Sequence, residues 1–165
     1  MQIRGYEPHD REACRALWRE LTEWHREIYG DQSIGGDGDL GDDFDEHLEH
    51  VGAGHIWVAE RDGAVVGFVG LIVEGRRGEL EPLVVTRDAR GSGVGRALAE
   101  CVIAAAREQG LRRLDVRPAA RNVSAVQFFH DAGFETLGQY ELMLYLDPPR
   151  EWPFQERIAE RDFRA

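Results

Sequence analysis

Apolar residues recur in the N-terminal part of the chain with the period of an α-helix, at spacings of four, four, three and four. They are Ala13, Leu17, Leu21, Trp24 and Ile28. Asp10 is the expected N-cap of this helix, and Gly30 is expected to end it. A loop rich in glycine and aspartate follows over Asp31–Asp43, and Phe44–Val51 has the pattern of a short second helix.

The middle of the chain has the turn signals and apolar runs of β-strands. His55–Arg61 and Val65–Glu74 flank the dipeptide Asp62-Gly63, which favours a tight primed turn, so these segments are expected to form a hairpin. The next strand is expected over Gly78–Thr86. It contains Pro82, which has no N–H to donate, so this strand is expected to be bulged or unpaired locally.

The remaining segments continue the alternation of helices and strands. Strands are expected over Gln2–Tyr6 and Leu111–Arg117, with two more in Phe134–Leu146, and helices over Val94–Gln109 and Asn122–Ala132. The resulting order is β-α-α-β-β-β-α-β-α-β-β. It predicts an α/β (α+β) fold whose mixed, largely antiparallel sheet of about seven strands carries one βαβ crossover and is flanked by about four helices.

Length and composition fit one globular domain. The chain has 165 residues, of which 42% are hydrophobic and 31% are charged. A single domain is expected over 1–146, followed by a tail or short helix over 147–165. Three apolar residues of that tail are expected to pack on the body or to form a homodimer contact: Trp152, Phe154 and Ile158.

The chain is strongly acidic, which limits its partners. It has 31 acidic and 20 basic residues, a formal net charge of −11, and no lysine. Nucleic acid is not an expected partner because it requires a basic face, whereas a cationic acceptor would be attracted. No apolar run approaches the length of a membrane span and no signal pattern opens the chain, so no membrane contact and a cytoplasmic location are expected.

The two cysteines, Cys14 and Cys101, both fall in helical patterns. They have no metal-ligand spacing and do not form a disulfide framework, so free, buried thiols and no metal are expected.

A glycine-rich segment, Arg90–Arg96, lies between an apolar strand and a helical pattern. Backbone N–H groups and the positive end of the helix dipole favour phosphate at such a turn. A Walker loop is excluded because the chain has no lysine. A dinucleotide fingerprint would have Arg96 in place of its third glycine, and a loop without a ligand is a further alternative.

Two blocks favour a third ligand, coenzyme A. Arg90-x-x-Gly93-x-Gly95 resembles the Q/R-x-x-G-x-G/A signature of the GNAT superfamily of acyl-CoA-dependent N-acyltransferases. The segment from Asn122 to Phe134, NVSAVQFFHDAGF, resembles that superfamily's second block, N-x-x-A-x-x-F-Y-x-x-x-G-F. The resemblance spans roughly 3–146. It implies transfer of an acetyl group from acetyl-CoA to an amine, with the acyl-pantetheine arm between a splayed fourth and fifth strand.

The transfer needs a base, because a free alkylamine has a pKa near ~10.4 and must lose a proton. Glu79 and Glu81 are two apart on the fourth strand and are expected on one face, in a row with Leu83 and Val85. The resemblance favours Glu81 as the base. The alternative is that both carboxylates are ordinary solvent-facing acids.

The resemblance also implies the cofactor contacts. Backbone amides of Leu83, Val84 and Val85 are the candidate oxyanion and pantetheine donors. The other candidates are Arg90, Gly91, Ser92, Gly93, Val94, Gly95, Arg96, Asn122 and Phe129. Asn122 is also a candidate helix cap. Phe129 departs from the family pattern, in which a tyrosine is proposed to protonate the leaving thiolate, so an acyl-CoA-binding sensor without turnover is the alternative function.

An acidic segment occupies the loop and second helix. It comprises Asp37, Asp39, Asp42, Asp43, Asp45 and Glu46. Its spacing does not fit a calcium loop. A solvated flexible loop is the favoured interpretation, and recognition of a cationic acceptor is the alternative, since the resemblance puts this segment on the acceptor side.

Overall fold

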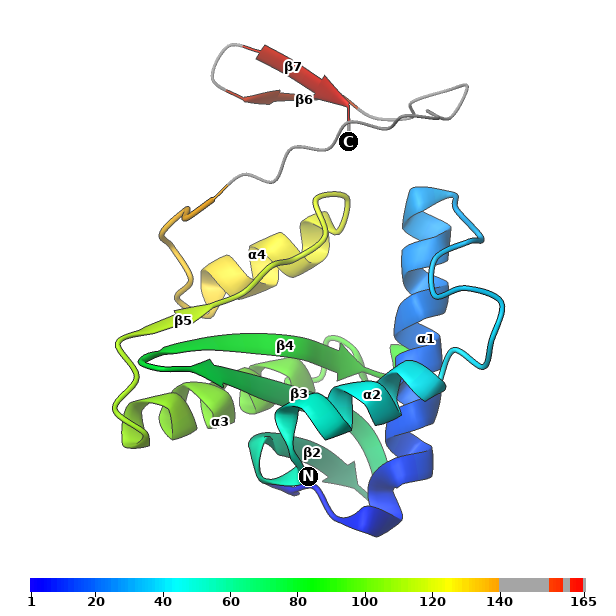
Figure 1. Cartoon of the computed structure of the whole chain (residues 1–165), viewed down its shortest axis with the longest axis vertical. Helices are drawn as coiled ribbons and strands as arrows, with labels where there is room; N and C mark the ends of the chain where they lie inside the picture. Colours follow the sequence, from blue (N-terminus) through cyan, green and yellow to red (C-terminus); the bar gives the residue numbers. More distant parts are fainter. Residues whose placement is uncertain (140–154, 159–160, 165) are drawn as a thin grey trace. The chain divides into compact units, whose positions relative to one another are not determined.

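The computed structural model describes residues 1–139, 155–158 and 161–164 (Figure 1). The chain divides into two compact units, Met1–Arg117 and Pro118–Ala165. This boundary lies inside the domain expected over 1–146, whose extent stays a prediction.

A five-stranded sheet in the order β1-β2-β3-β4-β5 forms the centre of the first unit (Figure 1). Its strands are β1 (Gln2–Gly5), β2 (Ile56–Arg61), β3 (Ala64–Glu74), β4 (Arg77–Val85) and β5 (Arg113–Asp115). Neighbouring strands run antiparallel except β4 and β5, which are parallel and joined through a helix. The predicted mixed, largely antiparallel sheet with one crossover is confirmed, with five strands in this sheet instead of about seven.

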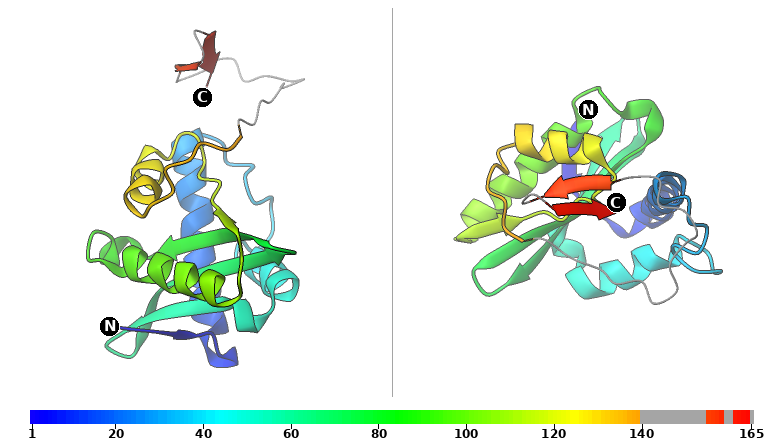
Figure 2. Two further views of the ribbon diagram at one scale, coloured as in Figure 1. Left: turned by 90° about the vertical axis from the view of Figure 1, so that its left-hand side faces the viewer. Right: turned by 90° about the horizontal axis from the view of Figure 1, so that it is seen from above.

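Helices cover both faces of this sheet (Figure 2). They are α1 (Arg11–Tyr29), α2 (Asp42–Val51) and α3 (Val94–Glu108). Phe68 of β3 packs with residues of α1 and α2, whereas a Cβ at the adjacent Gly67 would lie 3.2 Å from Leu98 of α3. Because successive residues of a strand face opposite sides, α1 and α2 cover one face and α3 covers the other.

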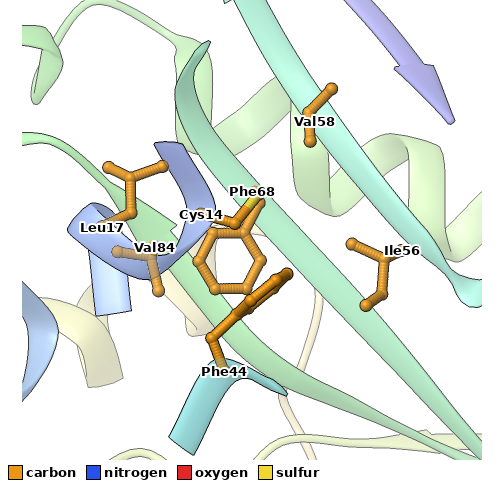
Figure 3. Packing of buried hydrophobic residues seen from close by; sticks show 7 residues of the cluster. All are labelled: Cys14, Leu17, Phe44, Ile56, Val58, Phe68 and Val84. Atoms are coloured by element: carbon orange, nitrogen blue, oxygen red, sulfur yellow. The ribbon is translucent and has the colours of Figure 1, made fainter. Parts of the chain in front are cut away.

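The core on the α1 and α2 side is aromatic and aliphatic (Figure 3). Its buried members are Cys14, Leu17, Phe44, Ile56, Val58, Phe68 and Val84. The rings of Phe44 and Phe68 meet edge to face, with centroids 5.4 Å apart. This cluster fixes α1 and α2 against β2, β3 and β4, so the segment between the two helices is anchored at both ends.

Local signals give correct ends for most elements. Asp62 and Gly63 both have positive φ, at 54° and 79°, as a primed turn requires, so the predicted hairpin is confirmed. Gly30 ends α1 in the left-handed conformation. Asp10 is the N-cap residue of α1, as predicted, but its carboxylate accepts from the Arg4 guanidinium and from the N–H of Glu7 and makes no capping hydrogen bond to α1.

The second unit contains helix α4 (Val123–Asp131) and a two-stranded sheet of β6 (Gln155–Ile158) and β7 (Arg161–Arg164). The two strands expected in Phe134–Leu146 lie partly outside the described residues, and the described part, 134–139, contains no strand. This pair of strands lies in the segment for which a tail or short helix was expected. Trp152 and Phe154 lie outside the described residues.

Candidate functional site

The glycine-rich turn gives α3 an open N-terminus. Gly91 and Gly93 have positive φ, at 72° and 87°, a backbone conformation that residues other than glycine rarely adopt. α3 begins at Val94, no side chain of the described residues caps it, and the N–H of Ala97 donates to the carbonyl of Gly93. The preceding N–H groups in the first turn therefore have no acceptor within the helix and remain available to an anion.

Arg90 is held by the protein, which sequence reasoning did not anticipate. Its Nε donates to the carbonyl of Val85 at 3.0 Å, its Nη2 lies 3.4 Å from Glu20, and its guanidinium lies 5.6 Å from the ring centre of Trp24. Arg90 therefore ties the turn to β4 and α1, whereas Arg96 is exposed and pairs with Glu100 at 2.9 Å.

Ser92 is also engaged within the turn. Its hydroxyl donates to the carbonyl of Ala89 and accepts from Arg61, each at 2.6 Å. Glu20 accepts from the hydroxyl of Thr86 at 2.9 Å and so connects α1 to the segment that precedes the turn. No sequence motif marks Glu20 or Trp24, because each acts on residues more than sixty positions away.

β4 pairs with β5 over only the first three of its nine residues. The last β4–β5 pair is Glu79 with Asp115, yet β4 continues to Val85 along β3. Within residues 1–139, the second half of β4 therefore has a strand neighbour on one side only. Since N–H groups alternate in direction along a strand, at least one amide in 83–85 points away from β3. The predicted splay is confirmed, and the role of these amides stays a prediction.

A bulge interrupts β4 where Pro82 predicted it. Leu71 pairs with Leu80 and Val69 pairs with Leu83, so Glu81 and Pro82 together oppose Gly70. The extra residue reverses which side chains of β4 face each side of the sheet. Before the bulge, Glu79 pairs with Ile72; after it, Val84 pairs with Phe68, which lies on the same face as Ile72. Leu83 and Val85 therefore lie on the face opposite to Glu79. The expected continuous row of Glu79, Glu81, Leu83 and Val85 is therefore wrong.

The two glutamates of β4 differ in their partners. Glu79 forms an ion pair with Arg117. Glu81 has no ion pair within the described part of the chain. Although Glu81 is exposed, the protein atoms crowding its carboxylate raise its pKa, and the neighbouring charge of Glu79 raises it further. Arg117 and His50 oppose this rise, so both lie near enough to act on the carboxylate.

His47 of α2 lies beside the bulge and was not among the site residues predicted from the sequence. Its Nε2 is buried and has no hydrogen-bond partner among the residues that the structure describes. Burial, and after it the charge of His50, lower the pKa of its imidazole to about 4, and the backbone of Glu81 acts in the opposite direction. The ring of Trp18 lies 5.2 Å away, centre to centre.

Two hollows adjoin this part of the sheet and share Ile72 and Glu74. The larger, of about 180 Å³, is lined by His50, Val51, His55, Ile72, Val73 and Glu74. The smaller has Glu79 and Arg117 in its lining. Since Glu79, Arg117 and His50 all influence the pKa of Glu81, both hollows contain a residue that acts on that carboxylate.

The acidic segment is tied to α1, so the favoured interpretation of a solvated flexible loop is wrong. Arg15 is buried and binds Asp39 at 2.8 Å, Asp42 at 2.6 Å, and also Asp45. Arg19 makes a second contact to Asp39 at 2.7 Å. A further arginine, Arg11, holds Asp45 at 2.7 Å. These arginines neutralise three of the six acids that were the candidate for recognising a cationic acceptor.

The block from Asn122 to Phe134 lies in the second unit. The side chain of Asn122 accepts from the N–H of Ala125 at 3.1 Å, so its predicted capping of α4 is confirmed. Phe129 packs between Phe128 and Phe134, with ring centres 5.0 Å and 5.7 Å away. Contacts of Asn122 and Phe129 with pantetheine stay predictions.

The part of the chain that the structure describes has no group of three or more metal-ligating side chains. Among those same residues, no helix is long and apolar enough to span a membrane.

Comparisons with known proteins agree with this geometry. The model of the Acetyltransferase (GNAT) family matches residues 16–134. N-acetyltransferase 8B of Rattus norvegicus is 33% identical over 108 residues, which are 62% of this chain and 48% of that protein. The chain thus spans about half the length of this curated relative.

Solved structures share the fold. The ribosomal-protein-alanine N-acetyltransferase from Brucella melitensis is 27% identical, with a TM-score of 0.66 over 84% of this chain and 86% of that one. N-acetylglutamate synthase from Neisseria gonorrhoeae, solved with coenzyme A and N-acetyl-glutamate, is 24% identical, with a TM-score of 0.61 over 80% of this chain and 27% of that one. With the open helix start, the splayed β4 and a family match over most of its length, this chain belongs to the GNAT family of acetyltransferases.

Proposed function

We propose that this protein transfers the acetyl group of acetyl-CoA directly to a primary amine. The observation that carries the proposal is the uncapped start of α3, which follows a strand that leaves its neighbour after Glu79. The turn offers backbone N–H groups to the diphosphate, and the free side of β4 offers amides to the pantetheine arm. Family membership supports acetyl-CoA as the donor.

Glu81 is the proposed general base. A carboxylate must be ionised to accept a proton. The raised pKa of Glu81 lies closer to the pKa of an alkylammonium, which makes proton transfer from the ammonium to Glu81 less unfavourable. The neutral amine then attacks the thioester carbonyl, the C–N bond forms, and the C–S bond breaks. The attacking nitrogen loses its second proton as coenzyme A leaves as a thiolate, the thiolate takes up a proton through water, and Glu81 returns the first proton to solvent. An N–H from 83–85 would stabilise the oxyanion.

The proposed acceptor is a primary amine on a cationic small molecule or peptide. The net charge of −11 favours the approach of a cation. The named substrate class of the Brucella relative, a protein alanine, is one example of a peptide amine. The arginine-bound acids of the α1–α2 segment are poor candidates for binding it, which leaves the hollows beside Glu79 and His50 as the better location.

An acyl-CoA-binding sensor is the second candidate, because one residue of the second block favours it. Phe129 has no hydroxyl with which to protonate the leaving thiolate. A thiol with a pKa near ~8.5 is nevertheless a fair leaving group, and water can complete the step. Release of free thiol from acetyl-CoA over a panel of amines separates the candidates, since a sensor binds acetyl-CoA without releasing thiol.

Gly93→Glu tests the phosphate turn. It puts a carboxylate at the helix N-terminus, at a φ of 87°, and is expected to lower acetyl-CoA affinity about 100-fold in calorimetry. Gly36→Glu is the matched control: Gly36 also has positive φ, 70°, and open space around it, but lies in the loop between α1 and α2. Equal affinity of the wild type and the Gly93 variant would contradict the proposal.

A further inference from the structure

Three groups converge at the β4 bulge on the side covered by α2. A methyl group at Gly70 would lie 2.3 Å from the carbonyl oxygen of Glu81 and 2.8 Å from Nε2 of His47. Real Cβ atoms do not come this close to other atoms, so only glycine allows the carbonyl and the imidazole to meet there. The glycine, the bulge and the histidine therefore form one local arrangement.

The imidazole of His47 has an unused hydrogen-bonding atom in this arrangement. Nε2 is buried without a partner in the described part of the chain, and an unsatisfied buried polar atom is costly. Since the pKa of the ring is lowered to about 4, the ring is neutral at pH 7 and carries one N–H. With that hydrogen on Nε2, the nearby acceptor is the backbone carbonyl of Glu81.

The surroundings of His47 hold the ring in place. Trp18 of α1 packs against one side of the His47 ring. On α2, His50 is the titratable group whose charge lowers the pKa of His47. β4 contributes the Glu81 peptide. Contacts of catalytic groups are often long in a free enzyme and shorten when substrates bind, so the missing hydrogen bond does not argue against a role in the complex.

We propose that His47 is a positioning residue for Glu81: its Nε2–H donates to the Glu81 carbonyl and so fixes the direction in which the Glu81 carboxylate leaves the bulge. This inference rests on the proposed role of Glu81 as base. His47 touches neither substrate in this scheme. It holds the peptide of the residue that does, and Gly70 provides the space for the contact.

Two substitutions separate this role from simple packing. His47→Gln keeps an N–H donor at a similar reach, whereas His47→Phe keeps a ring against Trp18 and removes the donor. We expect His47→Phe to lower kcat about tenfold, the value of one hydrogen bond, with the KM for acetyl-CoA unchanged. His47→Gln is expected to stay within about threefold of wild type. Glu49→Gln, an exposed change on the same helix, is the control.

A second measurement does not depend on turnover. The carboxyl carbon of Glu81, followed by NMR through a pH titration of the substrate-free protein, reports the position of that carboxylate relative to Glu79 and Arg117. We expect its titration midpoint to move in His47→Phe and to stay in His47→Gln. Midpoints that are unchanged in both variants, or equal losses of kcat in both, would overturn the inference. Absence of acetyl transfer by the wild type would instead refute the proposed function.

Discussion

Acidic residues in two regions of this protein have opposite surroundings. In the segment between α1 and α2, Asp39 and Asp45 accept hydrogen bonds from arginines of α1, and these bonds lower the pKa of both carboxylates. On β4, Glu81 has no arginine of its own, because Arg117 is paired with Glu79, and its pKa is raised. Residues of the same chemical type are thus held ionised in one region and made easier to protonate in the other.

The difference separates carboxylates that stabilise the fold from one suited to proton transfer. A carboxylate fixed by a guanidinium gains little from taking a proton, whereas a carboxylate crowded by protein atoms and a like charge is a better base. The number of acids in a segment therefore does not identify a site, and the partner of each acid does.

Removal of the carboxylate on β4 is expected to give the largest effect. Glu81→Gln keeps the size of the side chain but cannot accept the proton of the amine. We expect kcat to fall about 100-fold or more, with the KM for acetyl-CoA unchanged, in a thiol-release assay. Glu46→Gln, an exposed change in the acidic segment, is the control. A kcat for Glu81→Gln within twofold of wild type would remove the distinction between the regions.

Removal of the central arginine of the other region should act on stability and not on chemistry. Arg15→Leu leaves Asp39, Asp42 and Asp45 without their shared partner. We expect the Tm to fall by about 5 °C, with kcat at low temperature little changed. Arg107→Leu, at an exposed site on α3, should leave the Tm within about 1 °C. A large increase in acceptor KM at an unchanged Tm would instead support acceptor recognition by the acidic segment.

The two regions should also lose their functions at different pH. Glu81 must be ionised to act, so kcat/KM should fall as the pH decreases through its raised pKa, above the ordinary value of 4.5. The lowered pKa values of Asp39 and Asp45 add stability above the unfolded value near ~3.9, and this stability is lost as the pH falls through their lower folded values.

Activity should therefore disappear before the fold does. Circular dichroism and kcat/KM measured over the same pH series check this order. In Arg15→Leu the acid unfolding transition should move to higher pH, whereas the activity profile between pH 5 and 8 should keep its shape. Coincident loss of activity and ellipticity in the wild type would contradict the separation.

The sequence alone determined the features that depend on neighbouring residues. Positive φ at Gly91 and Gly93, the primed turn at Asp62-Gly63 and the bulge beside Pro82 follow from the conformational limits of glycine and proline. Helical and strand periodicity placed α3 and the crossover for the same local reason.

Only the tertiary structure decided which charges meet. Arg15 lies 24, 27 and 30 positions from its three aspartates, and Arg90 binds Glu20 across 70 positions. No periodicity reports such pairs, because they form when packed elements bring distant side chains together. The lack of a hydrogen-bond partner for Nε2 of His47 among the described residues and the raised pKa of Glu81 also depend on the folded chain, because burial and neighbouring charge exist only there.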